Sequence, residues 1–186
     1  MTDFPHTKLK AQLYPIEAAR TPITTKQLGE LRNFCFFLQE NFSMMALTSA
    51  LDALRTANLL SEEQLYTFRL VSVDGSPVCS DLGFAAMADE SLDDLNLNDL
   101  DAFVVCGGLR VDLHAPAPLI KFLRLSDLRK KALGSLWNGL FALAEAGLME
   151  GKTGVVHRGN KASLRERFAS VDLKDKAYII GEQCFS

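Results

Sequence analysis

Short, almost continuous apolar runs alternate along the chain with segments in which apolar residues recur every three or four positions. Such runs are typical of strands covered on both faces of a parallel sheet, and the wider spacing is typical of amphipathic helices. The run LRNFCFFL at residues 31–38 is the clearest strand, and Met44, Leu47, Leu51 and Leu54 mark the first helix. We predict further strands at residues 67–73, 102–105, 153–156 and 177–180, and further helices at residues 116–131 and 161–168.

Two segments between these elements have weaker patterns. Residues 83–88 are predicted to form a short extra strand or one arm of a hairpin. The stretch 89–101 carries acidic but no basic residues, and its leucines predict a short helix beside the sheet with its carboxylates in water. We expect no metal role for these acids, because a hard cation needs convergent oxygen ligands rather than an acidic surface.

The segment LGSLWNGLFALAEAGLMEG at residues 133–151 predicts the end of a strand, a tight turn and then a helix that stops near Gly147. Trp137 stands at the tip of that turn. In several α/β enzymes a nucleophile occupies this position. An indole has no ionisable nucleophile, so this turn cannot supply one.

The alternation of strands and helices predicts an α/β fold with a flavodoxin-like, mostly parallel sheet and helices on both faces. Residues 1–30 contain three prolines and no sustained apolar period, so we expect an extended or partly disordered N-terminal arm, followed by one domain over residues 31–186. Open parallel sheets bind ligands at the carboxyl ends of their strands. The candidate ligand-binding residues at such ends are Phe42, Ser43, Gly107, Gly108, Trp137, Asn138 and His157.

One of these candidates also has a structural interpretation. Ser43 is a plausible N-cap of the helix that follows it. The pair Gly107-Gly108 would let the backbone approach a ligand closely.

Composition narrows the classes of function. The 186 residues carry a net charge of -3, with a pI near 5.6, so this segment lacks the positive field needed to bind nucleic acid directly. It contains no apolar run of about 20 residues and no secretory signal pattern, which predicts a cytoplasmic protein without a membrane partner. The spacing of its cysteines fits neither a disulfide framework nor a zinc site, and we predict no metal and no cofactor. The cysteines are Cys35, Cys79, Cys106 and Cys184.

Five segments together resemble the class I glutamine amidotransferase-like superfamily, in the PfpI-type branch that forms the N-terminal sensor domain of AraC-family transcription regulators. The resemblance covers residues 31–186. Its segments are FFLQENFSMMALTSALDALRTAN, VSVDGSPV, DAFVVCGG, GSLWNGLFALAEAGLMEGKTGVVH and AYIIGE.

The resemblance implies that a catalytic cysteine would stand where this chain has Trp137, which disfavours cysteine hydrolase or amidotransferase chemistry. Cys106 is the alternative nucleophile, although a buried packing role fits it better. The resemblance also places a histidine, His157, beside the turn, where it could be a wall of the pocket, a spectator or a general base.

Asp52 lies where related sequences usually carry a glutamate directed toward the crevice. Facing the crevice and facing solvent are equally compatible with its position. In the first case its carboxylate, with Trp137 and Phe42 as cation–π surfaces, would favour an amino acid or a quaternary amine. In the alternative view of the site, the Trp137 side chain plugs the former active-site cavity.

The resemblance further implies a last helix and a DNA-binding helix-turn-helix module, which this sequence does not contain. The chain is therefore either a piece of a longer regulator or a stand-alone form. We expect a noncatalytic domain that senses a small cytoplasmic metabolite and forms a homodimer. The alternatives are a hydrolase or lyase of the same superfamily, using Cys106 or His157, and a purely structural dimerisation module.

Overall fold

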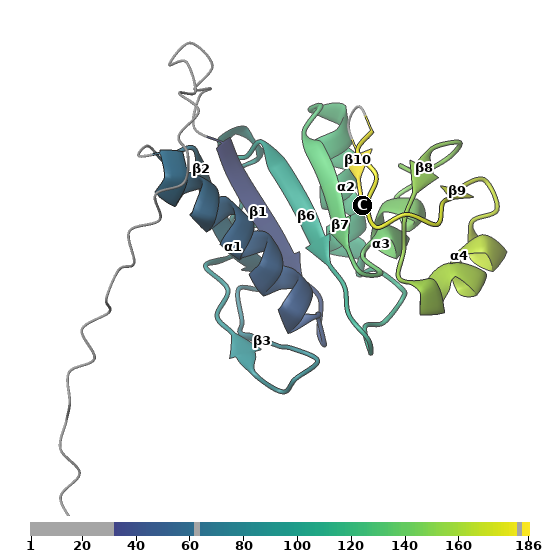
Figure 1. The fold of residues 1–186 in the computed structure, drawn as a ribbon, viewed down its shortest axis with the longest axis horizontal. Coiled ribbons are helices and arrows are strands. Elements are labelled where there is room, and N and C mark those ends of the chain that lie inside the picture. The colour runs from purple at the N-terminus through teal and green to yellow at the C-terminus, as the bar shows by residue number, and fades with distance from the viewer. Residues whose placement is uncertain (1–31, 62–63, 182–183) are drawn as a thin grey trace, which may run out of the picture.

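The computed structural model describes residues 32–61, 64–181 and 184–186. The arm expected at residues 1–30 lies outside the described residues. Six parallel strands form the central sheet in the order β10-β7-β6-β1-β2-β5 (Figure 1). This confirms the mostly parallel sheet. The strands are β1 (Arg32–Leu38), β2 (Tyr66–Ser72), β5 (Glu90–Ser91), β6 (Ala102–Cys106), β7 (Ala132–Leu136) and β10 (Cys184–Phe185).

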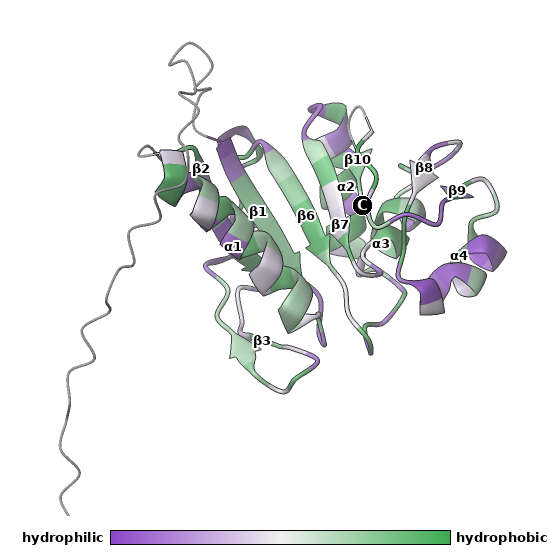
Figure 2. Cartoon of the chain, viewed as in Figure 1, coloured by the Kyte–Doolittle hydropathy of each residue, from purple (hydrophilic) through white to green (hydrophobic). Residues whose placement is uncertain are grey.

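Helices cover both faces of this sheet, as the pattern predicts. The helix α1 (Met44–Ser61) packs on one face, and α2 (Ala117–Leu128) and α3 (Leu140–Glu145) pack on the other (Figure 1). The helix α4 (Lys161–Arg167) lies beyond the β7–β10 edge and is largely hydrophilic (Figure 2). Ser43 acts as the N-cap of α1, since its Oγ accepts a hydrogen bond from the amide of Ala46 at 3.4 Å.

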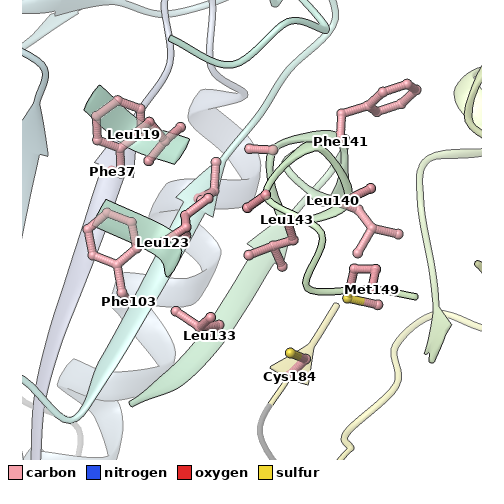
Figure 3. Packing of buried hydrophobic residues seen from close by; sticks show 14 of the residues in the cluster. Phe37, Phe103, Leu119, Leu123, Leu133, Leu140, Phe141, Leu143, Met149 and Cys184 are labelled. Carbon is pink, nitrogen blue, oxygen red and sulfur yellow. The ribbon is translucent and has the colours of Figure 1, made fainter. Parts of the chain in front are cut away.

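The larger core lies between the sheet and the α2–α3 face (Figure 3). Side chains alternate along each strand, so Phe37 and Phe103 point into this core while Phe36 and Val104 pack under α1. The Phe103 ring lies 4.6 Å from that of Phe122, centroid to centroid. Phe103 is fully buried, which accounts for the continuous apolar character of its strand.

Residues 83–88 form the expected hairpin arm, in which β4 (Ala85–Ala86) pairs antiparallel with β3 (Val78–Cys79). The short helix predicted within residues 89–101 is present only as three residues of 3₁₀ helix. This stretch contains β5 and a single 3₁₀ turn, η2 (Leu97–Asp99). Its Ser, Asp and Asn side chains bond to nearby backbone, as Asn96 does to the amide of Asn98 at 3.0 Å, and so favour turns over a helix.

The last two predicted strands are also placed differently. The segment at residues 153–156 supplies only β8 (Thr153–Gly154), which pairs with β9 (Asp172–Leu173) in a separate two-stranded sheet. Residues 177–180 are not a strand of the central sheet, and β10 takes that edge instead. The reason is packing, because the Phe185 ring lies over Gly134, where any added Cβ would meet it at 2.2 Å.

The end of α2 differs from the prediction by three residues. The helix stops at Leu128, and Lys130 adopts a left-handed backbone with φ of 55°. Arg129 and Lys130 therefore follow the helix rather than form its last turn. Their charges still lie beside its C-terminal carbonyls, where cations are favoured.

Candidate functional site

The turn between β7 and α3 has the tight geometry expected of it. Trp137 has φ of 63°, in the left-handed region where a side chain costs about 1 kcal/mol. Two residues later, a Cβ on Gly139 would lie 2.2 Å from the carbonyl oxygen of Val105. The turn therefore packs directly against β6, and the strained position presents the indole at the carboxyl edge of the sheet.

Asn138, the next residue of the turn, does not face a ligand. Its side chain is buried, and its side-chain amide forms two hydrogen bonds with the backbone of Gly108. Asn138 Oδ1 accepts a hydrogen bond from Gly108 N, and Asn138 Nδ2 donates one to Gly108 O, both at 2.9 Å. The expected ligand contact of Asn138 is thus replaced by a clamp between two loops.

The glycine pair after β6 serves loop packing rather than the approach of a ligand. A Cβ on Gly107 would lie 2.0 Å from Asn138 Oδ1, and one on Gly108 would lie 2.2 Å from the carbonyl oxygen of Asn41. Gly107 O also accepts a hydrogen bond from Ser43 N at 2.8 Å. The loops that follow β1, β6 and β7 are therefore interlocked at the centre of the sheet edge.

Three further candidates lie outside any open site. Phe42 is fully buried and Ser43 is 3% exposed, because both belong to the interlocked loops. Phe42 therefore offers no cation–π surface. Asp52 faces solvent, with 72% of its side chain exposed and an ion pair to Arg55 at 3.9 Å, so its crevice-facing alternative is wrong. It lies two turns along α1, on the face turned away from the sheet.

Trp137 and His157 are the two candidates that the structure brings together. Their rings stack with centroids 3.8 Å apart and planes inclined by 8°. The backbone supports this contact, since His157 N donates a hydrogen bond to Trp137 O at 3.0 Å. His157 Nδ1 in turn accepts one from Gly159 N at 3.3 Å, which fixes the ring at the start of the 3₁₀ turn η3 (Arg158–Asn160).

The stacked pair borders an open hollow of about 510 Å³. It lies between the β7–α3 turn, the start of α4 and the C-terminal segment that reaches β10. Of the residues that line this hollow, only Trp137 and His157 were predicted from the sequence. The polar residues of the wall that it missed are Ser135, Arg158, Lys161, Asp175, Lys176 and Ser186.

The charge of this hollow is mainly positive. Its lining contains three cationic side chains, Arg158, Lys161 and Lys176, against one carboxylate, Asp175, which pairs with Lys161. Anions are therefore favoured there over cations. The structure does not support the expectation of a cationic ligand, because the Asp52 carboxylate points to solvent and one face of Trp137 is covered by His157.

Cys106 cannot take over as a nucleophile at this edge. Its thiol is completely buried, burial raises its pKa far above the ordinary value, and its Sγ contacts the carbonyl oxygen of Val104 at 3.9 Å. The reactive form of a cysteine is the thiolate, which this environment suppresses. Burial also raises the pKa of Cys35, on the neighbouring strand β1, to about 12.

Other features of the described residues do not compete with the hollow beside Trp137. Within the described ranges, no group of His, Cys, Asp or Glu is placed to hold a metal ion. A groove of about 560 Å³ lies between residues 92–98 and α2, and it contains none of the candidate residues predicted from the sequence. No helix in the described part of the chain is long and apolar enough to cross a membrane.

Comparison with known proteins agrees with this architecture. The model of the DJ-1/PfpI family matches residues 32–183, and the chain belongs to that family. A solved AraC family transcriptional regulator from Pseudomonas putida is 36% identical, with a TM-score of 0.75 over 83% of this chain and 82% of that one.

Two curated transcription regulators of Pseudomonas aeruginosa are also similar. The HTH-type transcriptional regulator GbdR is 32% identical over 151 residues, which cover 81% of this chain and 41% of that protein. The HTH-type transcriptional regulator CdhR is 32% identical over 149 residues, 80% of this chain and 44% of that protein. The chain thus spans less than half the length of both regulators. The relatives identify its fold with the DJ-1/PfpI-type domain of AraC-type regulators.

Proposed function

We propose that residues 31–186 are a noncatalytic sensor domain of an AraC-type transcription regulator, and that its ligand enters the hollow beside Trp137. The observation that carries the proposal is the position of Trp137. Trp137 occupies the strained turn at the sheet edge, and its indole stacks on His157 and lines an open hollow of about 510 Å³. The indole is thus a wall of the hollow rather than its stopper.

Neither candidate nucleophile position at the described sheet edge is usable, which supports a role in binding. Trp137 has no ionisable group, and the Cys106 thiol is buried in the sheet. The similar proteins are transcription regulators, which is consistent with a role in binding rather than catalysis. Binding without turnover is what a sensor requires.

The lining of the hollow favours a small metabolite that carries a carboxylate, such as an amino acid. Arg158, Lys161 and Lys176 supply the cationic groups, and the free face of Trp137 supplies an apolar surface. A quaternary amine without a carboxylate fits this lining poorly. Of the two ligand classes suggested by the sequence, we therefore propose the amino acid and not the quaternary amine.

Regulation would follow from a change of geometry on binding. A ligand shifts an equilibrium only by its difference in affinity for two states. The hollow lies between the β7–α3 turn, α4 and the segment that reaches β10, so a bound carboxylate would bridge three parts of the chain. We propose that this change is passed on through a homodimer in the cytoplasm, and that a separate helix-turn-helix module contacts DNA.

Calorimetry on the purified chain tests this function. We expect one or more amino acids to bind, and tetramethylammonium not to bind. Arg158→Gln should weaken binding by at least about tenfold, because a charge-assisted hydrogen bond contributes about 1.5–3 kcal/mol. The matched control is Arg165→Gln, on the exposed face of α4 outside the hollow. Equal loss in both variants, or no binding across a panel of amino acids and other small carboxylates, would contradict the proposal.

A further inference from the structure

The hollow beside Trp137 has an inner and an outer part, which differ in burial. In the inner part, Ser135 on β7 is 5% exposed, and the side chain of Lys161, at the start of α4, is 17% exposed. Arg158 and Lys176 also line the hollow but are exposed, so they lie at its mouth. A ligand that fills the hollow therefore meets one pair of polar groups inside and a second pair outside.

Ser135 is the feature that points to a ligand in the inner part. Its partner on β6 is Val105, which belongs to the larger core, so the serine side chain turns toward the same face of the sheet. Within the described residues, its hydroxyl forms no hydrogen bond. The hydroxyl of Ser80 is also without a partner but is sealed from solvent, whereas that of Ser135 opens into the hollow. A ligand atom can therefore reach it.

Lys161 gives the inner part a positive charge. In the described part of the chain its ammonium has one partner, the carboxylate of Asp175. The side chain of Asp175 is 88% exposed, so the cation is mostly buried while its partner lies in water. An ammonium group has three N–H donors, and one carboxylate leaves donors for a second acceptor. The inner part is thus suited to a further anion beside the serine hydroxyl.

Hydrogen bonds hold the inner part in place before any ligand arrives. Val155 N donates to Ser186 Oγ at 2.8 Å, which ties the segment after β8 to the C-terminal segment. Ser186 also exchanges backbone hydrogen bonds with Ile179, at 2.7 and 3.0 Å. The walls around Ser135 are therefore fixed by the backbone, and the ordering cost of binding is small.

We propose that the ligand of this hollow carries two carboxylates, as an acidic amino acid does; the inference rests on the proposed sensor function and specifies its ligand. The side-chain carboxylate would accept hydrogen bonds from Ser135 and Lys161 in the inner part. The α-carboxylate would pair with Arg158 and Lys176 at the mouth. The α-ammonium group would stay near Asp175, because the charge of Lys161 repels it from the inner part.

Calorimetry at constant ionic strength with L-glutamate, L-glutamine, L-aspartate and L-asparagine tests the second carboxylate. Each acid differs from its amide by one charge and has nearly the same shape. We expect the tighter-binding acid to bind at least about tenfold more tightly than its amide, because the amide cannot form a charge-assisted pair with Lys161.

Four variants locate this preference. Lys161→Gln should abolish it. Ser135→Ala should weaken binding of the acid by at least about threefold without lowering the melting temperature, because the hydroxyl has no partner to lose in the free protein. Arg158→Gln should weaken binding of the acid and of the amide alike, since both have the α-carboxylate. The matched control Arg165→Gln, outside the hollow, should change neither.

Two results would overturn this inference. The first is equal affinity for each acid and its amide, which would show that the hollow binds only the α-carboxylate. The second is a preference for the acid that both Lys161→Gln and Ser135→Ala leave unchanged. Both results differ from failure of the sensor proposal, in which no amino acid or other small carboxylate binds at all.

Discussion

Gly108→Ala is expected to destabilise the domain by about 3 kcal/mol or more. A Cβ at this position would lie 2.2 Å from the carbonyl oxygen of Asn41, 2.6 Å from Ser43 N and 2.7 Å from the carbonyl carbon of Phe42. These atoms are all backbone, so no side chain can rotate away to make room. The loop after β1 has to move, and with it the start of α1. Urea unfolding of the variant and of the unaltered chain measures the difference.

Gly83→Ala is the matched control for that substitution. Gly83 has φ of 81°, but a Cβ there would meet nothing within 4 Å. Only the cost of a left-handed alanine remains, about 1 kcal/mol. Equal destabilisation by the two substitutions would show that the sheet edge is not interlocked at Gly108.

Asn138→Leu is expected to cost about 3 kcal/mol, although leucine is similar in size and apolar. The substitution removes both hydrogen bonds to Gly108 and leaves a buried N–H and a buried carbonyl without partners. An unsatisfied buried group costs about 1–3 kcal/mol. The free energy of unfolding again provides the measurement.

Asn98→Ala serves as the control for the asparagine. Asn98 is exposed, and its Oδ1 accepts only a long hydrogen bond from Arg129 at 3.4 Å. Asn98→Ala should lower the free energy of unfolding by no more than about 0.5 kcal/mol. If Asn138→Leu were as mild as this, the clamp between the β7–α3 turn and the loop after β6 would contribute little to stability.

The hydrophobic pattern was sufficient to predict the central architecture. The strands β1, β2 and β6 and the helix α4 lie within one residue of their predicted ends, and α1 begins at Met44, directly after the predicted N-cap. Each has a long or clearly periodic apolar pattern. The errors fall on short elements, where residues 177–180 and β10 are both apolar and only the fit of Phe185 over Gly134 decides which joins the sheet.

The candidate site was predicted less well, for a physical reason. Position at a strand's carboxyl end is a necessary feature of a site residue in this fold, but neighbouring loops also pack against one another there. Phe42, Gly108 and Asn138 take part in that packing and are buried. The sequence alone does not distinguish a loop that holds another loop from one that holds a ligand.

The missed residues of the hollow are of two kinds. Arg158 directly follows His157 and Lys161 comes three residues later, so the positive charges after that histidine could have indicated them. Lys176 and Ser186 come from the C-terminal segment, and the structure alone shows that it returns to the β7 edge. The charge preference of the hollow depends on both kinds together.

The central claim is that Trp137 lines an open and positively charged hollow. Trp137 is the only tryptophan of the chain, so its fluorescence reports on that hollow alone. The direct measurement is quenching by iodide and by caesium at matched ionic strength, each relative to N-acetyltryptophanamide. We expect iodide to quench Trp137, and caesium to quench it less than it quenches N-acetyltryptophanamide. Arg158→Gln should reduce this preference for iodide over caesium. Protection of Trp137 from both ions, or a preference for caesium, would contradict the account.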